Sequence, residues 1–142
     1  MKKYKLGYTT GVYDLYHVGH LNVLRNAKEK CDFLIVGVTT DELCYSRKNK
    51  YPIIPLDERM AIIESVKYVD LVVVQDSMDK IKAYEKFKFD VVFVGDDWKG
   101  TESWNKYEVE FNDVGVDVVY LKHTDGISSS IIRGKIDESK FK

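Results

Sequence analysis

The sequence has almost no excess charge, little cysteine and no long apolar run, and each absence excludes a class of protein. Its 22 basic and 23 acidic residues leave a net charge of −1, so no global field attracts nucleic acid or an anionic membrane. Cys31 and Cys44 are too few for the disulfide framework of a secreted scaffold. They could form one bridge, but Cys31 lies between a helical pattern and a buried strand pattern, which favours a reduced, inert thiol.

Segments that direct export or membrane insertion are also missing. The N-terminal MKKYKLGYTTG lacks the apolar core of a signal peptide, and no apolar run approaches the roughly 20 residues that span a bilayer. No repeat, low-complexity tract or linker interrupts the 142 residues. We therefore expect one cytoplasmic domain over residues 1–142, with no membrane insertion and no nucleic-acid partner.

Short apolar runs alternate with helical patterns along the chain. Strands are expected at Leu6–Thr10, Phe33–Val38, Asp70–Val74, Val91–Val94 and Val116–Leu121. Helices are expected at Val18–Lys30, at Glu58–Tyr68 with Asp57 as its cap, from Ser77 or Asp79 to Lys88, and at Ser128–Ile136. This alternation predicts an α/β fold: a single-domain, Rossmann-like open sheet of about five parallel strands with helices on both faces. Ligands of such sheets bind at the carboxyl ends of the strands.

The most informative segment runs from Gly11 to His20, between the first strand and the first helix. A glycine directly after a strand lets ligand phosphates approach backbone N–H groups, and a helix N-terminus favours negative charge. His17 and His20 are three residues apart, so both rings can project from one side of the helix. Zinc binding is an alternative for two histidines, but no Cys or His cluster supports it. The segment therefore predicts a phosphate site built on two histidines.

The His-x-Gly-His pattern, His17 to His20, resembles the signature of the cytidylyltransferase-like nucleotidyltransferases. Further matches follow in the order typical of that family: Arg59 in Asp-Glu-Arg, Lys67-Tyr-Val-Asp70, Gly95-Asp-Asp-Trp98-Lys-Gly100 and Thr124-Asp-Gly-Ile-Ser-Ser-Ser130. Together they span nearly the whole chain. Within the family, the short chain and the Gly-Asp-Asp-Trp segment are most similar to the enzymes that act on glycerol 3-phosphate.

The resemblance implies a direct transfer, in which the phosphate of a small phosphorylated alcohol attacks the α-phosphorus of CTP and pyrophosphate leaves. His17 and His20 would donate hydrogen bonds to phosphate oxygens, with Lys50 as a further catalytic residue. No general base is needed, because the attacking phosphate is already an anion. Asp14 would orient a histidine or help to hold Mg²⁺. The implied cofactor is Mg²⁺, or another divalent cation, with CTP.

The same resemblance implies binding residues in several segments. Those implied for the nucleotide are Thr10, Gly11, Val12, Gly19, Gly95, Asp96, Asp97, Trp98, Thr124, Gly126, Ile127, Ser128 and Ser129. For Asp96 and Asp97 it favours nucleotide contacts over a metal pair. Those implied for the acceptor phosphate are Arg47, Arg59 and Lys67. Each basic residue has a plainer interpretation as a solvated surface charge, and Trp98 has one as core packing.

This chain also departs from the family's pattern. Relatives commonly carry arginine where it has His123, arginine where it has Lys67, and threonine where it has Val12, and the basic segment Arg47–Lys50 is about one residue longer. The acceptor therefore stays open among glycerol 3-phosphate, choline phosphate, ethanolamine phosphate and another polyol phosphate. ATP as the donor and a nucleotide-binding regulatory module without turnover are the remaining alternatives. The resemblance further implies a homodimer and a product used for a cell-envelope polymer or capsule.

Overall fold

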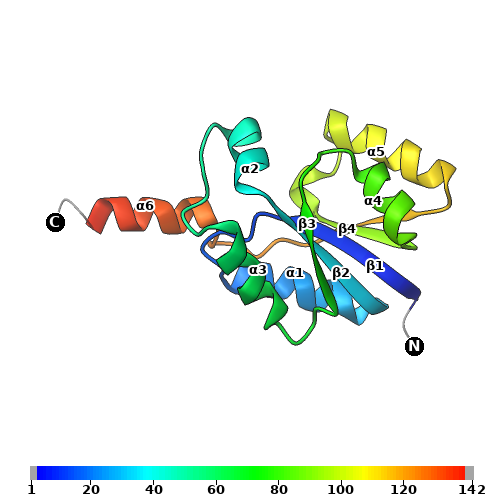
Figure 1. Ribbon diagram of the computed structural model, residues 1–142, viewed down its shortest axis with the longest axis horizontal. Helices are drawn as coiled ribbons and strands as arrows, with labels where there is room; N and C mark the ends of the chain where they lie inside the picture. Colours follow the sequence, from blue (N-terminus) through cyan, green and yellow to red (C-terminus); the bar gives the residue numbers. More distant parts are fainter. Residues whose placement is uncertain (1–2, 140–142) are drawn as a thin grey trace.

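The computed structural model describes residues 3–139, which form a five-stranded parallel sheet flanked by helices (Figure 1). The strands are β1 (Tyr4–Gly11), β2 (Cys31–Thr39), β3 (Leu71–Gln75), β4 (Val91–Gly95) and β5 (Asp117–Leu121). They are ordered β3-β2-β1-β4-β5, and all four pairings are parallel. The predicted Rossmann-like open sheet is confirmed.

Helices cover both faces of the sheet, as predicted. One face packs against α1 (Val18–Glu29) and α3 (Leu56–Glu64), and the other packs against α4 (Lys80–Phe87) and α5 (Glu102–Asp113). Alternation along β2 explains the two cores: Leu34 and Val36 join the α1 and α3 side, whereas Ile35 joins the α4 and α5 side. The sheet is therefore buried on both faces, which is why its strands read as continuous apolar runs.

Two helices lie where no helix was predicted. The α2 helix (Asp41–Lys48) follows β2, with the Thr40 hydroxyl accepting a hydrogen bond from the Leu43 backbone N–H. The predicted basic loop is therefore partly helical, because Arg47 and Lys48 form the last turn of α2. The α5 helix begins after Thr101 in the same way.

The predicted helix Glu58–Tyr68 has different ends. Pro55, not Asp57, is its N-terminal cap, because the Pro55 carbonyl already accepts from the Arg59 backbone N–H. Asp57 lies in the first turn, where its charge suits the helix dipole. The helix ends at Glu64, so Lys67 lies in the turn before β3 and is not helical.

The order of strands reverses between β1 and β4, which are neighbours in the sheet. Connections leaving β1 and β4 diverge from this point, so their carboxyl ends border an open crevice. The turn after β1, the short helix η1 (Asp96–Trp98) after β4, and the start of α6 (Ser129–Ser139) all lie at this edge. Among the described residues, no helix is long and apolar enough to cross a membrane.

Candidate functional site

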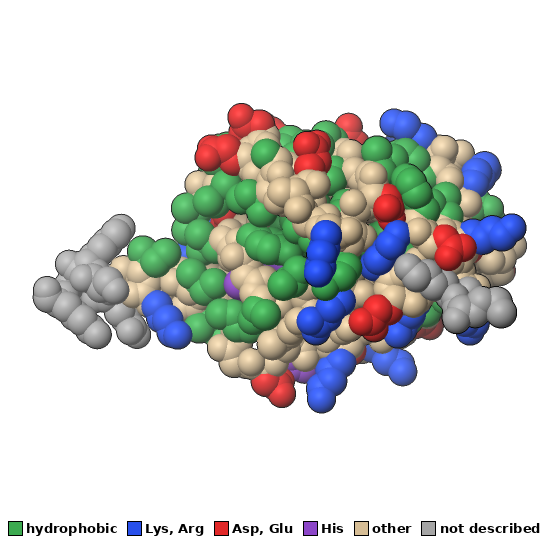
Figure 2. Space-filling view, turned by 90° about the horizontal axis from the view of Figure 1, so that it is seen from below, with side chains coloured by type: hydrophobic (Ala, Val, Ile, Leu, Met, Phe, Trp, Pro, Cys, Tyr) green, Lys and Arg blue, Asp and Glu red, His purple; other side chains and the backbone are tan. Residues whose placement is uncertain are grey.

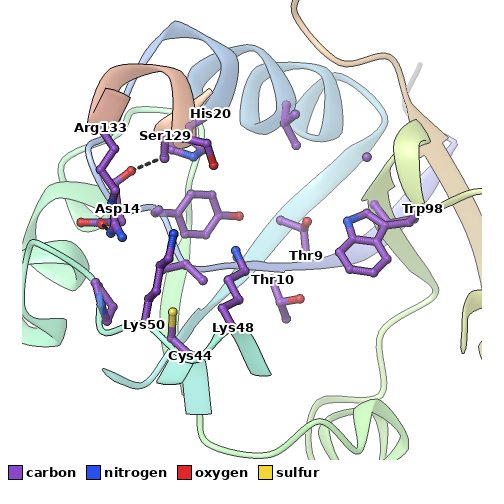
Figure 3. Close-up of a pocket in the computed structure, with 18 of the residues that line it drawn as sticks. Thr9, Thr10, Asp14, His20, Cys44, Lys48, Lys50, Trp98, Ser129 and Arg133 are labelled. Atoms are coloured by element: carbon purple, nitrogen blue, oxygen red, sulfur yellow. Dashed lines mark hydrogen bonds and ion pairs between the residues drawn. The ribbon is translucent and has the colours of Figure 1, made fainter. Parts of the chain in front are cut away.

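A cavity of about 600 Å³ opens at the carboxyl ends of β1 and β4 (Figure 3). This volume lies within the usual range for small-molecule sites. Predicted site residues that line it are Thr10, Gly11, Val12, Asp14, His20, Lys50, Gly95, Trp98 and Ser129. Lining residues that sequence reasoning missed include Lys48, Tyr51, Trp104 and Arg133. The three segments predicted to share one edge of the sheet therefore do meet.

The two histidines are held by the N-terminus of α1. The backbone N–H of Gly19 donates to Nδ1 of His17 (3.0 Å), which is the N-cap, and the backbone N–H of His17 donates to Nδ1 of His20 (3.2 Å). Each neutral ring therefore accepts at Nδ1 and carries its proton on Nε2. The two rings are stacked with their centroids 3.9 Å apart. The pair thus offers two Nε2–H donors, fixed in tautomer by the backbone.

The surroundings keep both rings neutral. Burial lowers the pKa of His17, and burial together with the neighbouring His17 lowers the pKa of His20 to about 4. Tyr16 stacks on His20 and Tyr13 meets it edge-on, so aromatic rings form the apolar surroundings. Gly19 is required here because a Cβ would lie 2.7 Å from Cε1 of His17. Gly19 was predicted to contact the nucleotide; in the structure its lack of a side chain first of all leaves room for the His17 ring.

The turn after β1 is held in an unusual backbone conformation. Tyr13 and Leu15 have positive φ angles of 56° and 51°, which non-glycine residues seldom adopt, and Asp14 lies between them. The Asp14 carboxylate accepts from the backbone N–H groups of Ile53 and Ile54, both at 2.9 Å. Asp14 thereby clamps the segment before α3 onto this turn.

Asp14 also holds α6 against the turn. Nη2 of Arg133 donates to the Asp14 carboxylate at 2.6 Å, and the Ser129 hydroxyl donates to the Asp14 backbone carbonyl at 2.5 Å. Burial alone would raise the pKa of Asp14, but the two amides and Arg133 outweigh it and lower that pKa. Both carboxylate oxygens are therefore engaged, and no hydrogen bond joins Asp14 to either histidine. This geometry argues against both roles predicted for Asp14.

A protein-bound metal does not fit the described residues. They contain no group of three or more His, Cys, Asp or Glu side chains that could hold an ion. Asp14, the single carboxylate among the described cavity-lining residues, already carries Arg133. A second cation at Asp14 would be repelled by that guanidinium.

Basic side chains without a carboxylate partner surround the rest of the cavity. Lys48 and Lys50 line it and extend into it in Figure 3. Arg47, exposed on α2, does not line it, but its guanidinium lies 5.7 Å from the centre of the Trp98 ring at the rim. Trp98 is itself exposed, which favours the predicted aromatic wall over core packing. These groups leave positive charge free for an anion.

Lys80 is a further cation that sequence reasoning missed. Its side chain is buried, its ammonium donates to the Thr10 hydroxyl (3.1 Å) and lies over the Trp104 ring, and both Thr10 and Trp104 line the cavity. No carboxylate of the described residues pairs with it, and burial, with Arg47 nearby, lowers its pKa to about 8. One signal was available: Lys80 opens α4, where a positive charge opposes the helix dipole.

Two predicted acceptor-phosphate residues do not reach the cavity. Arg59 is fully buried, and its guanidinium donates to the carbonyls of Val12, Thr39 and Ile54 and pairs with Asp41 at 2.5 Å. Its donors are used inside the protein, so the structure corrects the prediction and gives Arg59 a positioning role. Lys67 is exposed in the turn before β3, at the amino end of that strand, and this places it at the opposite edge of the sheet from the cavity.

The remaining predicted residues, His17 and Gly19 among them, are not part of the cavity lining. Asp96 binds His123, and the Asp97 carboxylate folds back over Gly95. Thr124 accepts a hydrogen bond from Asn22 of α1, and Ile127 lies beside Gly19. The Ser128 hydroxyl accepts from the Ile131 backbone N–H at the start of α6, so Ser128 acts there as a helix cap, whereas Ser129 and Ser130 face the cavity. Gly126, with a φ angle of 78°, forms the turn before them.

Arg133 could have been found from the sequence by its spacing. Ser129 and Arg133 are four residues apart on one helix and so share a face. With Ser129 placed at a phosphate site, this spacing would have pointed to position 133 as its neighbour on the helix. Both residues line the cavity.

Comparisons with known proteins agree with this geometry. The sequence profile of a family described as cytidylyltransferase-like matches residues 8–135. A glycerol-3-phosphate cytidylyltransferase from Staphylococcus aureus is 39% identical over 129 residues, which cover 90% of this chain and 92% of the relative. An FAD synthase from Archaeoglobus fulgidus is 33% identical over 113 residues, covering 80% of this chain and 81% of that protein. The crystal structure of a lipopolysaccharide core biosynthesis protein from Thermoplasma volcanium GSS1 superimposes with a TM-score of 0.71 at 28% identity, covering 85% and 97% of the two chains.

Proposed function

This chain belongs to the cytidylyltransferase-like family, and on that premise we propose that it transfers CMP from CTP to glycerol 3-phosphate, releasing pyrophosphate and CDP-glycerol. The chain is a cytidylyltransferase enzyme; the identity of the acceptor is our proposal. The main support for this proposal is the positive charge of the cavity. Among the described lining residues the single carboxylate, Asp14, is paired with Arg133, so the other cations have none to balance them.

The histidine pair supports the transfer step. Negative charge builds on the non-bridging oxygens of the α-phosphorus and on the departing pyrophosphate during the reaction. The backbone of α1 fixes two Nε2–H donors, of which that of His20 belongs to a cavity-lining residue, and we propose that both donate to those oxygens. Because His17 and His20 are neutral before the nucleotide binds, they add donors without repelling the cations that hold the acceptor.

The unpaired cations support a phosphate dianion as the acceptor's reactive group. Lys80 is buried without an anion, which is unfavourable until a ligand supplies one. Arg47 lies close enough to depress the pKa of Lys80, so the two positive charges are neighbours. We place the acceptor phosphate between Arg47 and Lys80, with Lys48 and Lys50 directed toward the phosphates of CTP. This arrangement keeps the roles predicted from the sequence, in which Arg47 binds the acceptor phosphate and Lys50 acts in the transfer step.

The same charges favour a polyol over a cationic alcohol. Choline phosphate and ethanolamine phosphate each carry a positive nitrogen, which needs a carboxylate or an aromatic cage away from other cations. Among the described lining residues the single carboxylate is Asp14, which is already paired with Arg133, and the rings of Trp98 and Trp104 already lie against the cations Arg47 and Lys80. Glycerol 3-phosphate has a neutral polyol end, so it needs neither a carboxylate nor an aromatic cage.

For CTP, we propose that Gly95, Trp98 and the segment around Asp96 and Asp97 form the nucleoside site. Ser129, Ser130 and the N-terminus of α6 would then face the terminal phosphates of the nucleotide. We propose that Mg²⁺ enters bound to the triphosphate, because the described residues offer no group of three or more ligands that could hold an ion.

We also propose that the enzyme is a homodimer. A broad group of hydrophobic side chains occupies the middle of the face shown in Figure 2. Large apolar residues that remain exposed include Ile62, Leu71 and Val74. Exposed apolar groups of this kind are typical of surfaces that bind another protein.

The test is pyrophosphate release from CTP and Mg²⁺ with a panel of acceptors: glycerol 3-phosphate, a longer polyol phosphate, choline phosphate and ethanolamine phosphate. We expect glycerol 3-phosphate to react fastest and CDP-glycerol to appear by mass spectrometry. A His20→Ala variant serves as the inactive control. Equal rates with choline phosphate would contradict the charge argument. No release with any acceptor would favour the regulatory nucleotide-binding module, and equal rates with ATP would remove the Gly95–Trp98 segment from donor choice.

A further inference from the structure

His123 joins two segments that border the nucleotide side of the cavity. Its Nδ1 lies 2.7 Å from Oδ1 of Asp96, at the start of η1, and its Nε2 lies 3.0 Å from Oδ1 of Asp125. The backbone N–H of His123 also donates to the Asp96 carboxylate at 3.3 Å. One imidazole thus stands between two carboxylates from different parts of the chain.

We propose that His123 is a positioning residue, which in its protonated form clasps Asp96 to the segment 123–130 and so orders the nucleotide site for CTP. The proposal rests on the function proposed above, since it concerns binding of the same nucleotide. His123 acts through Asp96 and Asp125 and itself needs no contact with the ligand.

The chemistry of the ring makes this clasp depend on pH. Two carboxylates need two N–H donors, which only the imidazolium provides; a neutral ring has one donor and turns a lone pair toward the other carboxylate. The hydrogen bond to Asp96, with added attraction from Asp125, raises the pKa of His123 above its ordinary value. The charged groups facing the ring are Asp96 from η1 and Asp125 from its own segment. The clasp is therefore complete at low pH and loses its charge and one of its two ring donors as pH rises through the raised pKa.

The segment held by His123 reaches the reactive end of the site through further contacts. Thr124 accepts a hydrogen bond from Asn22 of α1, and Ser129 donates to the Asp14 carbonyl. The start of the segment is thus tied to η1 by His123 and to α1 by Thr124, and its other end is tied to the turn after β1 by Ser129. Deprotonation of the ring loosens η1, with Trp98, in this frame, although the backbone N–H of His123 still binds Asp96, and it leaves His17 and His20 in place.

The experiment measures KM for CTP, kcat and direct CTP binding by calorimetry from pH 6 to 9, in wild type and in His123→Arg and His123→Gln. We expect the wild-type KM for CTP to rise about threefold from pH 6 to pH 9, which is the size of effect that one exposed charge pair produces. The pH dependence of kcat should be the same in wild type and in both variants. His123→Arg keeps a permanent charge, so its KM should lack this rise. His123→Gln should have the high KM at every pH.

Lys122→Gln is the matched control, an exposed neighbour outside these contacts, and it should keep the wild-type profile. Titration of CTP itself affects all variants equally, so the comparison is between profiles. Identical profiles for wild type and His123→Arg, or a wild-type KM in His123→Gln, would overturn the proposal. CTP binding is measured without an acceptor, so failure of the proposed acceptor leaves this test intact.

Discussion

Replacing Lys80 with methionine should stabilise the free protein and weaken the enzyme, two effects of opposite sign. Burial, with Arg47 nearby, lowers the pKa of Lys80 from 10.5 to about 8. A fall of about 2.5 at 1.36 kcal/mol for each pKa unit means that keeping this charge in the folded state costs about 3 kcal/mol at neutral pH. Methionine removes that cost, together with the hydrogen bond to Thr10 and the contact with Trp104, each worth on the order of 1 kcal/mol. The net stabilisation should be about 1 kcal/mol.

The pH dependence identifies the charge as the cause. The folded pKa of Lys80 lies below the unfolded one, so the unfolded chain binds more protons between about pH 8 and 10.5. The free energy of unfolding of the wild type therefore rises relative to that of Lys80→Met across this pH interval. The stability advantage of the variant disappears by about pH 10.5. Urea unfolding at pH 7 and at pH 10 measures both free energies. Lys82→Met, an exposed lysine on the same helix, is the control and should change neither.

Activity should move the other way. Loss of one charged donor to the acceptor phosphate raises KM for glycerol 3-phosphate by about 10- to 100-fold. The KM for CTP should change less, because the proposed contact is with the acceptor. A Lys80→Met variant that is destabilised at pH 7 and keeps its acceptor KM would refute the assignment of Lys80 as an unpaired, ligand-directed cation.

Further predictions concern the two histidines, Asp14 and the oligomeric state. His17→Ala and His20→Ala should each lower kcat by about 10²-fold in the pyrophosphate assay, and a rate near wild type in either would sink their proposed role. Asp14→Ala should lower the free energy of unfolding by about 2 kcal/mol, because it leaves Arg133 and the amides of Ile53 and Ile54 unpaired. The pKa of Asp14 is lowered despite its burial, so the contribution of Asp14 to the free energy of unfolding is lost as pH falls through that pKa. Asp14→Asn should therefore make the free energy of unfolding depend less on pH in the acid range. An unchanged dependence would count against the clamp. Sedimentation equilibrium should give twice the mass of one chain, and the monomer mass would contradict the homodimer.

The sequence predicted the sheet because buried parallel strands leave a strong signal. Val91–Val94 and Phe33–Val38 are apolar on both faces, so they read as continuous runs, and the alternating helices fix the crossovers. The α2 helix gave a weaker signal, since only Cys44 among its eight residues is buried. Its caps were nevertheless readable, with Thr40 before it and Asn49 after it in the left-handed conformation.

Side-chain roles were harder to predict, because a pattern of residue types does not reveal which groups pair. Arg59 matches a family motif, yet its guanidinium is buried against three carbonyls and Asp41. Those partners come from β1, β2 and the segments around α2, which no local pattern connects. Lys80 belongs to no motif, and only the fold brings it beside Thr10.

Pairing divides the cations around the cavity into two kinds, and this division decides what the site can bind. Arg59 and Arg133 have carboxylate partners, Asp41 and Asp14, and these pairs hold the segments that enclose the cavity. Four other cations have no carboxylate partner in the described part of the chain: Arg47, Lys48, Lys50 and Lys80. A chain with a net charge of −1 thus carries a local positive surplus, visible only when each basic group is counted with its partner. The triphosphate of a nucleotide and a second phosphate supply the negative charge that this surplus lacks, whereas a regulatory module binding one nucleotide would leave the buried Lys80 without an anion.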